Sequence, residues 1–387
     1  MLIPYDLVTT KLNLWYTAIK NDRVEQAESI KQEVESELNQ MEENQDVLLY
    51  YQLLLFRHEI MLVYMKSKSV EEIKPSYEVL KKKENKLNKM LEYYFFFFMG
   101  MYEFRRKELV TAISAYQMAE DRLSEIQDEI ERAEFYFKVS EVFYYMKQTY
   151  FSLNYTKRAL KIYKKYDTYK DRIIHCRFII AGNLMDVLDN EKAIRELKLG
   201  LQEAHETGRR HLIATIELNL GIAYRIVGKY DVGYAHLLRA LEIFNVEGHS
   251  FKTKTLFNLA HLLLQKNDFK EAKVYFKKGY ERARTLEDKE YIEKFKLIDG
   301  LYYKDDTSLI DEALSYFNYN RLYADIEEYS NEAADLFFKR GDQALSAEYY
   351  RRVILARNQI KKGEFMYEPK SSYLNFDDYN GRGYICD

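Results

Sequence analysis

The segment MEENQD, at positions 41–46, brings acidic and amide side chains together just before a long apolar helical stretch. Its residue types allow two kinds of chemistry. Asn44 can cap the following helix while Asp46 complements the helix dipole. A carboxamide such as that of Gln45 donates and accepts hydrogen bonds without titrating. Residue types alone favour the capping interpretation, and Gln45 by itself carries no functional weight.

Polar residues also recur along the middle and end of the chain, where an extended ligand could lie against them. An asparagine can clamp a peptide backbone whatever its side chains are, and an aspartate can bind an amine or a basic side chain. The candidates are Asn183, Asp186, Asn219, Asn258, Tyr145 and Asp325. Polar residues in a groove are also often simply solvated, so the elements that position them decide between the two interpretations.

The sequence excludes several other chemistries. Its seven histidines are scattered, and it has no HExxH, Gly-rich phosphate loop or nucleophile elbow. The two cysteines form no CxxC and the amino terminus has no signal-peptide pattern, which predicts a cytoplasmic protein. A net charge of −3 disfavours direct nucleic-acid binding. The longest apolar run, residues 93–102, is about half a membrane span, so no membrane partner is expected. The scattered histidines and the missing HExxH motif predict no metal site.

Small residues recur at intervals of about 40 positions, with a last interval of about 33. They are Ala112, Ser152, Ala193, Gly233, Ala272, Ala313 and Ser346. In most units a second small residue stands twelve positions earlier, a bulky residue four later and a small residue seven later. This register resembles that of tetratricopeptide repeats, in which two antiparallel helices cross closely. The usual period is about 34, so lengthened helices or inter-repeat turns are expected.

Composition and periodicity predict an all-α fold with four parts. There are only 3 prolines, and no hairpin turn lies between alternating β-branched runs. Residues 1–66 are predicted to form a three-helix bundle and 67–92 a helical connector, in which Pro75 starts a helix. Residues 93–366 would form a right-handed tetratricopeptide superhelix of about six to seven helix pairs, followed by a polar tail at 367–387. The aromatic run 93–102 is interpreted as core, with a mobile hinge as the alternative.

The repeat register places the polar candidates on the inner surface of the array, which the first helix of each pair lines. Asn219 takes position six of its helix, and Asn183 and Asp186 take positions ten and thirteen of theirs. Asn258 repeats position six in a later unit. Tyr145 and Asp325 are further inner-face candidates.

Long motifs resemble the Rap family, which comprises aspartyl-phosphate phosphatases and anti-activators of Bacillus, its phages and mobile elements. The motifs are LNLWY, MEENQD, LEYYFFFFMGMYE, IERAEF, FKVSE and EYYRRVILARNQIKKGE. The resemblance spans about residues 5–365. The family usually has MEEDQD, so Asn44 removes one charge beside the glutamine and leaves the regulator preference open.

The resemblance implies a function for each part. The bundle, with part of the connector, would dock on a response regulator, and Gln45 would enter its active site to position the attacking water. Glu42, Glu43 and Asp46 would be rim contacts that set partner choice. The divalent cation would come from the receiver domain, so the protein would need no cofactor of its own. A secreted and reimported penta- or hexapeptide would bind the groove, chiefly at Asn219 and Asp186.

Two other functions fit the same sequence. A non-catalytic anti-activator would sequester the DNA-binding domain of a regulator, because the glutamine motif also occurs in such members. A plain tetratricopeptide adaptor would bind no signalling peptide. A DNA-binding peptide receptor is disfavoured, because residues 1–66 contain no helix-turn-helix pattern.

Overall fold

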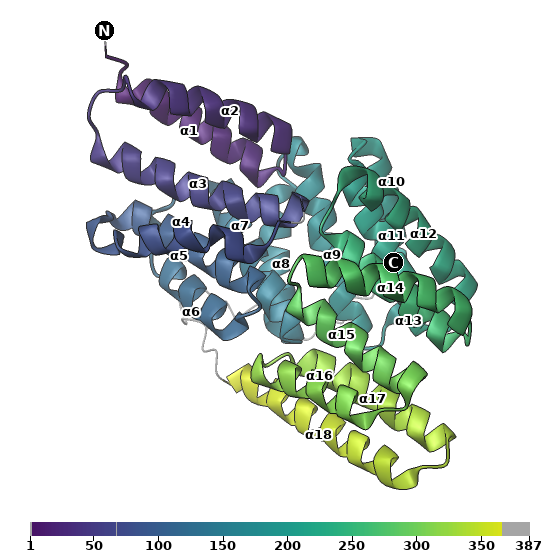
Figure 1. The fold of residues 1–387 in the computed structure, drawn as a ribbon. Coiled ribbons are helices and arrows are strands. Elements are labelled where there is room, and N and C mark those ends of the chain that lie inside the picture. The colour runs from purple at the N-terminus through teal and green to yellow at the C-terminus, as the bar shows by residue number, and fades with distance from the viewer. Residues whose placement is uncertain (1, 67, 366–387) are drawn as a thin grey trace, which may run out of the picture. The chain divides into compact units, whose positions relative to one another are not determined.

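The computed structural model describes residues 2–66 and 68–365 (Figure 1). Within these residues the regular elements are helices, apart from one isolated parallel bridge between Ile3 and Met41. The chain divides into two compact units, residues 1–322 and the residues from Tyr323 onward. The all-α prediction is confirmed.

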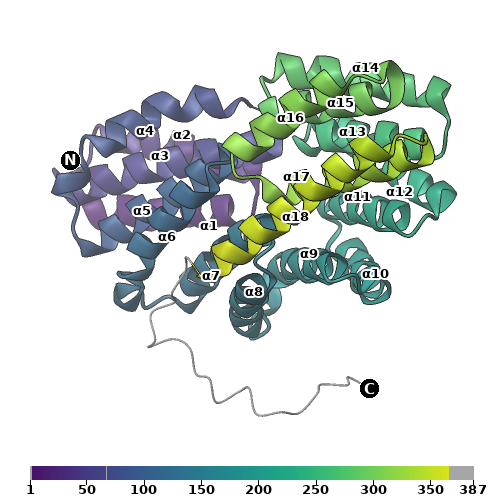
Figure 2. The same ribbon diagram turned by 90° about the horizontal axis from the view of Figure 1, so that it is seen from below.

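Three helices precede the repeats: α1 (Tyr5–Lys20), α2 (Val24–Leu38) and α3 (Gln45–Lys66). His58 of α3 links all three, because its Nδ1 accepts from Trp15 Nε1 of α1 at 2.8 Å and its Nε2 lies 3.1 Å from Glu28 Oε1 of α2. Burial lowers the pKa of His58 and so favours the neutral ring that can accept this bond. Helix α3 packs against α5 as well as against α1 (Figures 1 and 2).

The connector contains two 3-10 turns, Val70–Ile73 and Glu84–Lys86, on either side of α4 (Lys74–Lys81). Pro75 lies in the first turn of α4, where its missing N–H costs nothing, as the sequence predicted. The first repeat helix begins at Lys89 rather than at residue 93. Asn88 sets this start, because its Oδ1 accepts from the Leu91 N–H at 3.0 Å.

Seven antiparallel helix pairs follow within the described residues, in agreement with the predicted number. The pairs are α5 (Lys89–Arg105) with α6 (Leu109–Glu120), α7 (Glu129–Tyr145) with α8 (Thr149–Tyr163), α9 (Lys170–Asp186) with α10 (Asn190–Thr207), α11 (Arg210–Ile226) with α12 (Tyr230–Glu247), α13 (Phe251–Gln265) with α14 (Phe269–Thr285), α15 (Lys289–Asp299) with α16 (Thr307–Tyr319), and α17 (Tyr323–Lys339) with α18 (Gln343–Phe365).

The small residues lie where paired helices cross, as their register predicted. A Cβ added to Gly100 would lie 2.3 Å from the ring of Tyr116, and one added to Gly221 would lie 2.5 Å from Leu237. The period near 40 comes from long helices, since α10, α11 and α12 contain 18, 17 and 18 residues. Gly208 and Gly248 close α10 and α12 in the left-handed conformation, with φ of 66° each.

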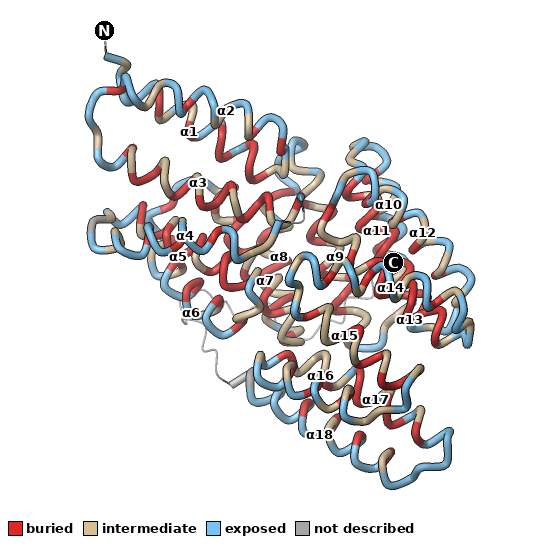
Figure 3. The backbone as a smooth tube through the Cα atoms, in the orientation of Figure 1, coloured by how far each residue is buried: buried red, intermediate tan, exposed pale blue. Residues whose placement is uncertain are grey.

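The apolar stretches are used in the core. Of the described helices, α3 alone is long and apolar enough to cross a membrane, and 67% of its most apolar window is buried inside the protein (Figure 3). The aromatic run 93–102 lies within α5 and is largely buried, which confirms its interpretation as core.

The second unit contains α17 and α18, whose Phe337 and Tyr349 rings stack at 5.5 Å. Asp325 lies in the first turn of α17. The predicted polar tail, 367–387, lies outside the described residues.

Candidate functional site

Gln45 is the first residue of α3, and its side chain is exposed. Asn44 caps this helix, because its Oδ1 accepts from the Val47 N–H at 3.1 Å. The capping interpretation of Asn44 is therefore correct. It does not compete with a role for Gln45, since capping uses the neighbouring side chain and leaves the Gln45 carboxamide facing solvent.

The amino-terminal segment fixes the loop before Gln45. The Ile3 N–H donates to the Gln40 carbonyl at 2.8 Å, and the Glu42 N–H donates to the Ile3 carbonyl at 2.9 Å. Glu42 and Glu43 are exposed in this loop. Gln45 Nε2 lies 3.5 Å from Glu43 Oε1, a contact too long to hold the amide firmly. The amide is thus presented on an anchored backbone and can turn toward a partner.

Asp46 is also exposed, but it already has a contact within the chain. Its Oδ2 accepts from Asn88 Nδ2 at 3.0 Å, and Asn88 is the cap of α5. Asp46 therefore links the start of α3 to the start of the first repeat. A substitution at Asp46 would disturb this link as well as any rim contact with a partner.

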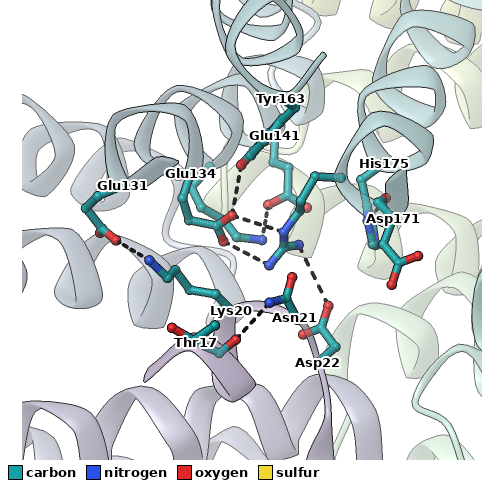
Figure 4. A network of polar contacts seen from close by, with 12 residues as sticks. Thr17, Lys20, Asn21, Asp22, Glu131, Glu134, Glu141, Tyr163, Asp171 and His175 are labelled. Carbon is teal, nitrogen blue, oxygen red and sulfur yellow. Dashed lines mark hydrogen bonds and ion pairs between the residues drawn. The ribbon is translucent and has the colours of Figure 1, made fainter. Parts of the chain in front are cut away.

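A buried polar network, which the sequence analysis missed, joins the bundle to the repeats (Figure 4). Glu131 of α7 is 1% exposed. It accepts from the Tyr16 hydroxyl at 2.8 Å and from Lys20 Nζ at 3.1 Å, both on α1, and from the Tyr93 hydroxyl at 3.2 Å. The only sequence signal is the pattern IERAEF, which places Glu131 and Glu134 among apolar residues.

Arg172 of α9 forms the second part of this network. It is 3% exposed and lies 3.2 Å from Glu134 of α7 and 3.7 Å from Asp22 in the α1–α2 turn. Burial is the largest single influence and would raise the pKa of both carboxyls. The Arg172 guanidinium, together with neighbouring cations such as Lys138, outweighs burial and holds each pKa below its ordinary value. The two carboxylates therefore stay ionised around one arginine.

Two further contacts hold the bundle against later repeats. Arg209, at the start of α11, donates to the Asn21 carbonyl at 2.8 Å. The Ser250 hydroxyl, at the start of α13, donates to the Tyr64 carbonyl at 2.5 Å, and the Tyr64 ring packs on His249 at 4.9 Å. Residues nearly two hundred positions apart therefore meet, and the bundle is docked along the repeat array.

The first and sixth helix pairs also meet. Lys107 Nζ, in the α5–α6 turn, lies 2.8 Å from Glu290 Oε2 of α15. A cavity of about 790 Å³ lies beside this ion pair, and Tyr145 lines it with its ring centroid 4.5 Å from Lys107 Nζ. The Lys107 charge lowers the pKa of Tyr145. Of the predicted peptide contacts, only Tyr145 belongs to the described lining of this cavity.

The other predicted groove residues differ in accessibility. Asn219 on α11 is partly exposed, and the Asp186 carboxylate at the end of α9 is 21% exposed with Lys147 Nζ 3.9 Å away. Asn258 is only 6% exposed, and its amide donates to the Lys254 carbonyl at 2.9 Å. Asp325 lies in the second unit. Asn219 and Asp186 therefore remain the accessible candidates on α9 and α11.

The prediction that Asn183 faces the groove is wrong. The residue is 0% exposed, and its amide donates to the Ser152 hydroxyl and to the Ile179 carbonyl, both at 2.8 Å. Its partner is the reason: Ser152 occupies the small position of its repeat, where a buried hydroxyl favours a polar neighbour. A serine in place of the usual alanine or glycine was the available signal.

We expect Asn183→Ala to act on stability rather than on ligand binding. Removing a buried hydrogen-bonded amide should lower the free energy of unfolding by about 1–3 kcal/mol. Denaturant unfolding measures this loss, and titration with a groove ligand should give the wild-type affinity. A large loss of ligand affinity with unchanged stability would show instead that Asn183 contacts the ligand in the groove.

The chain is similar to known proteins along most of its length. Residues 2–63 match the model of the response regulator aspartate phosphatase H amino-terminal family, and residues 212–285 match a tetratricopeptide repeat model. Response regulator aspartate phosphatase I of Bacillus subtilis (strain 168) is 53% identical over 97% of both chains. Phosphatase A of the same organism is 37% identical over 95% of this chain and 98% of its own.

Two solved structures are similar at different levels. The crystal structure of a Rap protein complexed with competence and sporulation factor has a TM-score of 0.86 at 37% identity, covering 92% of this chain and 99% of that one. The apo form of RapI has the same coverage at 53% identity, but a TM-score of 0.59. The chain therefore superposes more closely on the complex with competence and sporulation factor than on the relative whose sequence is more similar.

Proposed function

Because the chain belongs to the Rap family of response regulator aspartate phosphatases, we propose that it dephosphorylates the aspartyl phosphate of a bacterial response regulator in the cytoplasm under the control of a short peptide. The observation that carries the proposal is the exposed carboxamide of Gln45 on an anchored loop at the start of α3. Relatives named as aspartate phosphatases match over nearly their whole length, which supports the catalytic reading.

In the proposed reaction this chain only has to position the attacking water. An aspartyl phosphate is a reactive mixed anhydride, so water placed in line with phosphorus displaces the aspartate carboxylate and releases inorganic phosphate and a proton. Gln45 would accept a hydrogen bond from that water through its Oε1 and donate through its Nε2 to a neighbouring acceptor. The receiver domain would supply the divalent cation that neutralises the developing charge. Glu42 and Glu43 would contact the rim of the receiver.

The signalling ligand would be a penta- or hexapeptide bound on the inner faces of α9 and α11. Asn219 would clamp its backbone, and Asp186 would take its amine or a basic side chain. Tyr145 would contribute an aromatic side chain to this site. It is the last residue of α7, and Lys147, two residues later, lies close to Asp186. The similar crystal structure of a Rap protein complexed with competence and sporulation factor supports a ligand of this class.

Peptide recognition leads to a separate prediction. Asn219→Ala and Asp186→Ala should each weaken peptide binding roughly 5- to 150-fold, because a buried polar group of the peptide loses its partner at a cost of about 1–3 kcal/mol. Regulator dephosphorylation without peptide should stay at the wild-type rate. Calorimetry measures the affinity, and Asn154→Ala on the outer helix α8 is the matched control. Undiminished affinity in both groove variants would refute this assignment.

Docking of the bundle would be the event that the peptide controls. The Glu131 and Arg172 contacts hold α1 against α7 and α9 in this structure. If the peptide favours this arrangement and the regulator disfavours it, each ligand must lower the affinity of the protein for the other by the same factor. Equal peptide affinity with and without regulator would contradict gating.

Docking of the bundle leaves the Gln45 carboxamide accessible. The bundle is docked here, yet the Gln45 side chain is exposed. Inhibition would therefore act on the surface that holds the regulator, which includes α3 and the connector, rather than by burying the carboxamide. The bundle is also not an independent piece, because α3 packs on α5 and α1 on the buried Glu131. Point variants are cleaner tests than removal of residues 1–66.

A panel of phosphorylated receiver domains, with and without candidate peptides, tests the whole proposal. Loss of phosphate from at least one receiver, suppressed by a peptide, is the expected result. Two relatives, at 37% and 33% identity, are named regulatory protein RapC and RapF rather than phosphatases, so a non-catalytic anti-activator is the alternative. That alternative predicts tight binding of a regulator whose phosphate is not lost.

A further inference from the structure

A small cavity lies at the centre of the junction between the bundle and the repeats. Its volume is about 30 Å³, which is room for one or two waters or for one small ion. Its charged lining comes from four helices and one turn: Arg57 of α3, Arg105 of α5, Lys138 and Glu141 of α7, Arg172 of α9 and Asp22 of the α1–α2 turn. His175 lines the cavity too, and Figure 4 labels it together with Asp22 and Glu141.

The charges around this cavity do not balance locally. Lys138 lies 2.8 Å from Glu141, and Arg172 is shared between Asp22 and Glu134. Among residues 2–66 and 68–365, neither of the remaining lining cations, Arg57 and Arg105, forms an ion pair, and the Arg57 charge acts on the buried Glu134 only by helping to hold its pKa down. Arg105 is partly exposed and lies over the Tyr64 ring at 4.7 Å. Arg57 is 4% exposed, so water outside the protein does not neutralise its charge.

Two donors in the lining lack an acceptor within the described structure. The Nε of Arg57 and the hydroxyl of Tyr116 are both buried without a hydrogen-bond partner. Burial raises the pKa of the Tyr116 hydroxyl well above its ordinary value, so this group remains a donor. Gly100 lets the Tyr116 ring approach α5 closely, and Tyr116 is one of the residues that line the cavity. Unpaired buried donors are costly, and an anion satisfies both.

We propose that this cavity binds one small monovalent anion of the chloride type. Arg57 and Tyr116 donate to it, and Arg105 supplies further positive potential. The neutral His175 and the apolar Met61 and Met101 complete a lining that is too small for phosphate or carboxylate ligands. Because Arg57 belongs to the bundle and Tyr116 to the first repeat pair, the anion stabilises the docked arrangement.

Thermal unfolding of the full chain tests this proposal. At equal ionic strength, replacing gluconate by chloride or bromide should raise the apparent melting temperature by an amount on the order of 2–4 °C, increasing with the logarithm of halide concentration once the site fills. Gluconate is too large for the cavity. Arg57→Met and Tyr116→Phe should each remove most of the halide-dependent rise, even if their melting temperatures in gluconate differ from wild type.

A matched variant separates a bound ion from general salt effects. Arg177→Met removes an arginine that pairs with Glu196 and Glu203 on the repeats, away from the cavity, and should keep the full halide response. Crystals soaked in bromide should show an anomalous peak within hydrogen-bonding distance of Arg57 and Tyr116. The same response in Arg57→Met as in wild type, or a cavity without bromide in such crystals, would overturn the proposal.

Discussion

Replacing Gln45 with alanine should slow dephosphorylation of the cognate receiver by roughly 10²-fold or more, the scale lost when a group that positions a reactant is removed. Binding of the regulator should change little, because the anchored backbone of the loop and the carboxylates of Glu42 and Glu43 remain. Single-turnover release of phosphate from a phosphorylated receiver measures the rate. Direct binding of the receiver to the variant measures the affinity.

Gln40 provides the control for this experiment. It is an exposed glutamine in the same loop, and only its backbone carbonyl takes part in the contact with Ile3. Gln40→Ala should therefore keep the wild-type rate. A wild-type rate in Gln45→Ala would sink the catalytic assignment, whereas equal losses in both variants would indicate that the loop binds the regulator rather than positioning water.

Arg172→Met should be the most destabilising change at the junction between the bundle and the repeats. It leaves Glu134 and Asp22 buried without their shared cation, and breaking a buried ion pair in this way costs about 3–5 kcal/mol. The protein has two ways to relieve this cost: unfolding, or separation of the α1–α2 turn from α9. Denaturant unfolding measures the first, and small-angle scattering of the folded variant measures the second.

Arg177→Met is the matched control here too. Arg177 also contacts two carboxylates, at 2.6 and 2.8 Å, but its side chain is 22% exposed and its partners are 30% and 35% exposed, so its loss should cost at most about 1 kcal/mol. Similar stability losses in the two variants would show that burial of the Arg172 network carries no special weight.

The same network predicts how stability depends on pH. The pKa of Asp22 and of Glu134 is lowered in the folded protein from the ordinary values of 3.8 and 4.5. Their contribution is therefore complete above those ordinary values and is lost as pH falls through the lower, folded-state values. Arg172→Met should lack this part of the acid dependence, which unfolding measurements at several pH values can detect.

The sequence by itself determined the features that depend on local spacing. The small residues at intervals of about 40 identified the helix pairs, because only a small side chain admits a crossing helix, as at Gly100 and Gly221. Asn44 was recognisable as a cap, since a cap bonds to a backbone group two or three residues away. The segment MEENQD similarly identified Gln45 as a candidate before its exposure was known.

Only the tertiary structure decided which distant residues meet. Tyr16 and Lys20 lie more than a hundred positions from Glu131, and Arg209 lies 188 positions from Asn21. Spacing along the chain carries no information about such partners, because they depend on how far the repeat array winds before it reaches the bundle. The prediction that Asn183 binds the peptide failed for a related reason. Its repeat register was correct, but its amide donates a buried hydrogen bond to the Ser152 hydroxyl on the neighbouring helix. Local periodicity thus predicts the helices and the faces they bury. The docking of the bundle and the buried ion pairs beneath it depend on contacts between residues that are far apart in the sequence, and these contacts exist only in the folded structure.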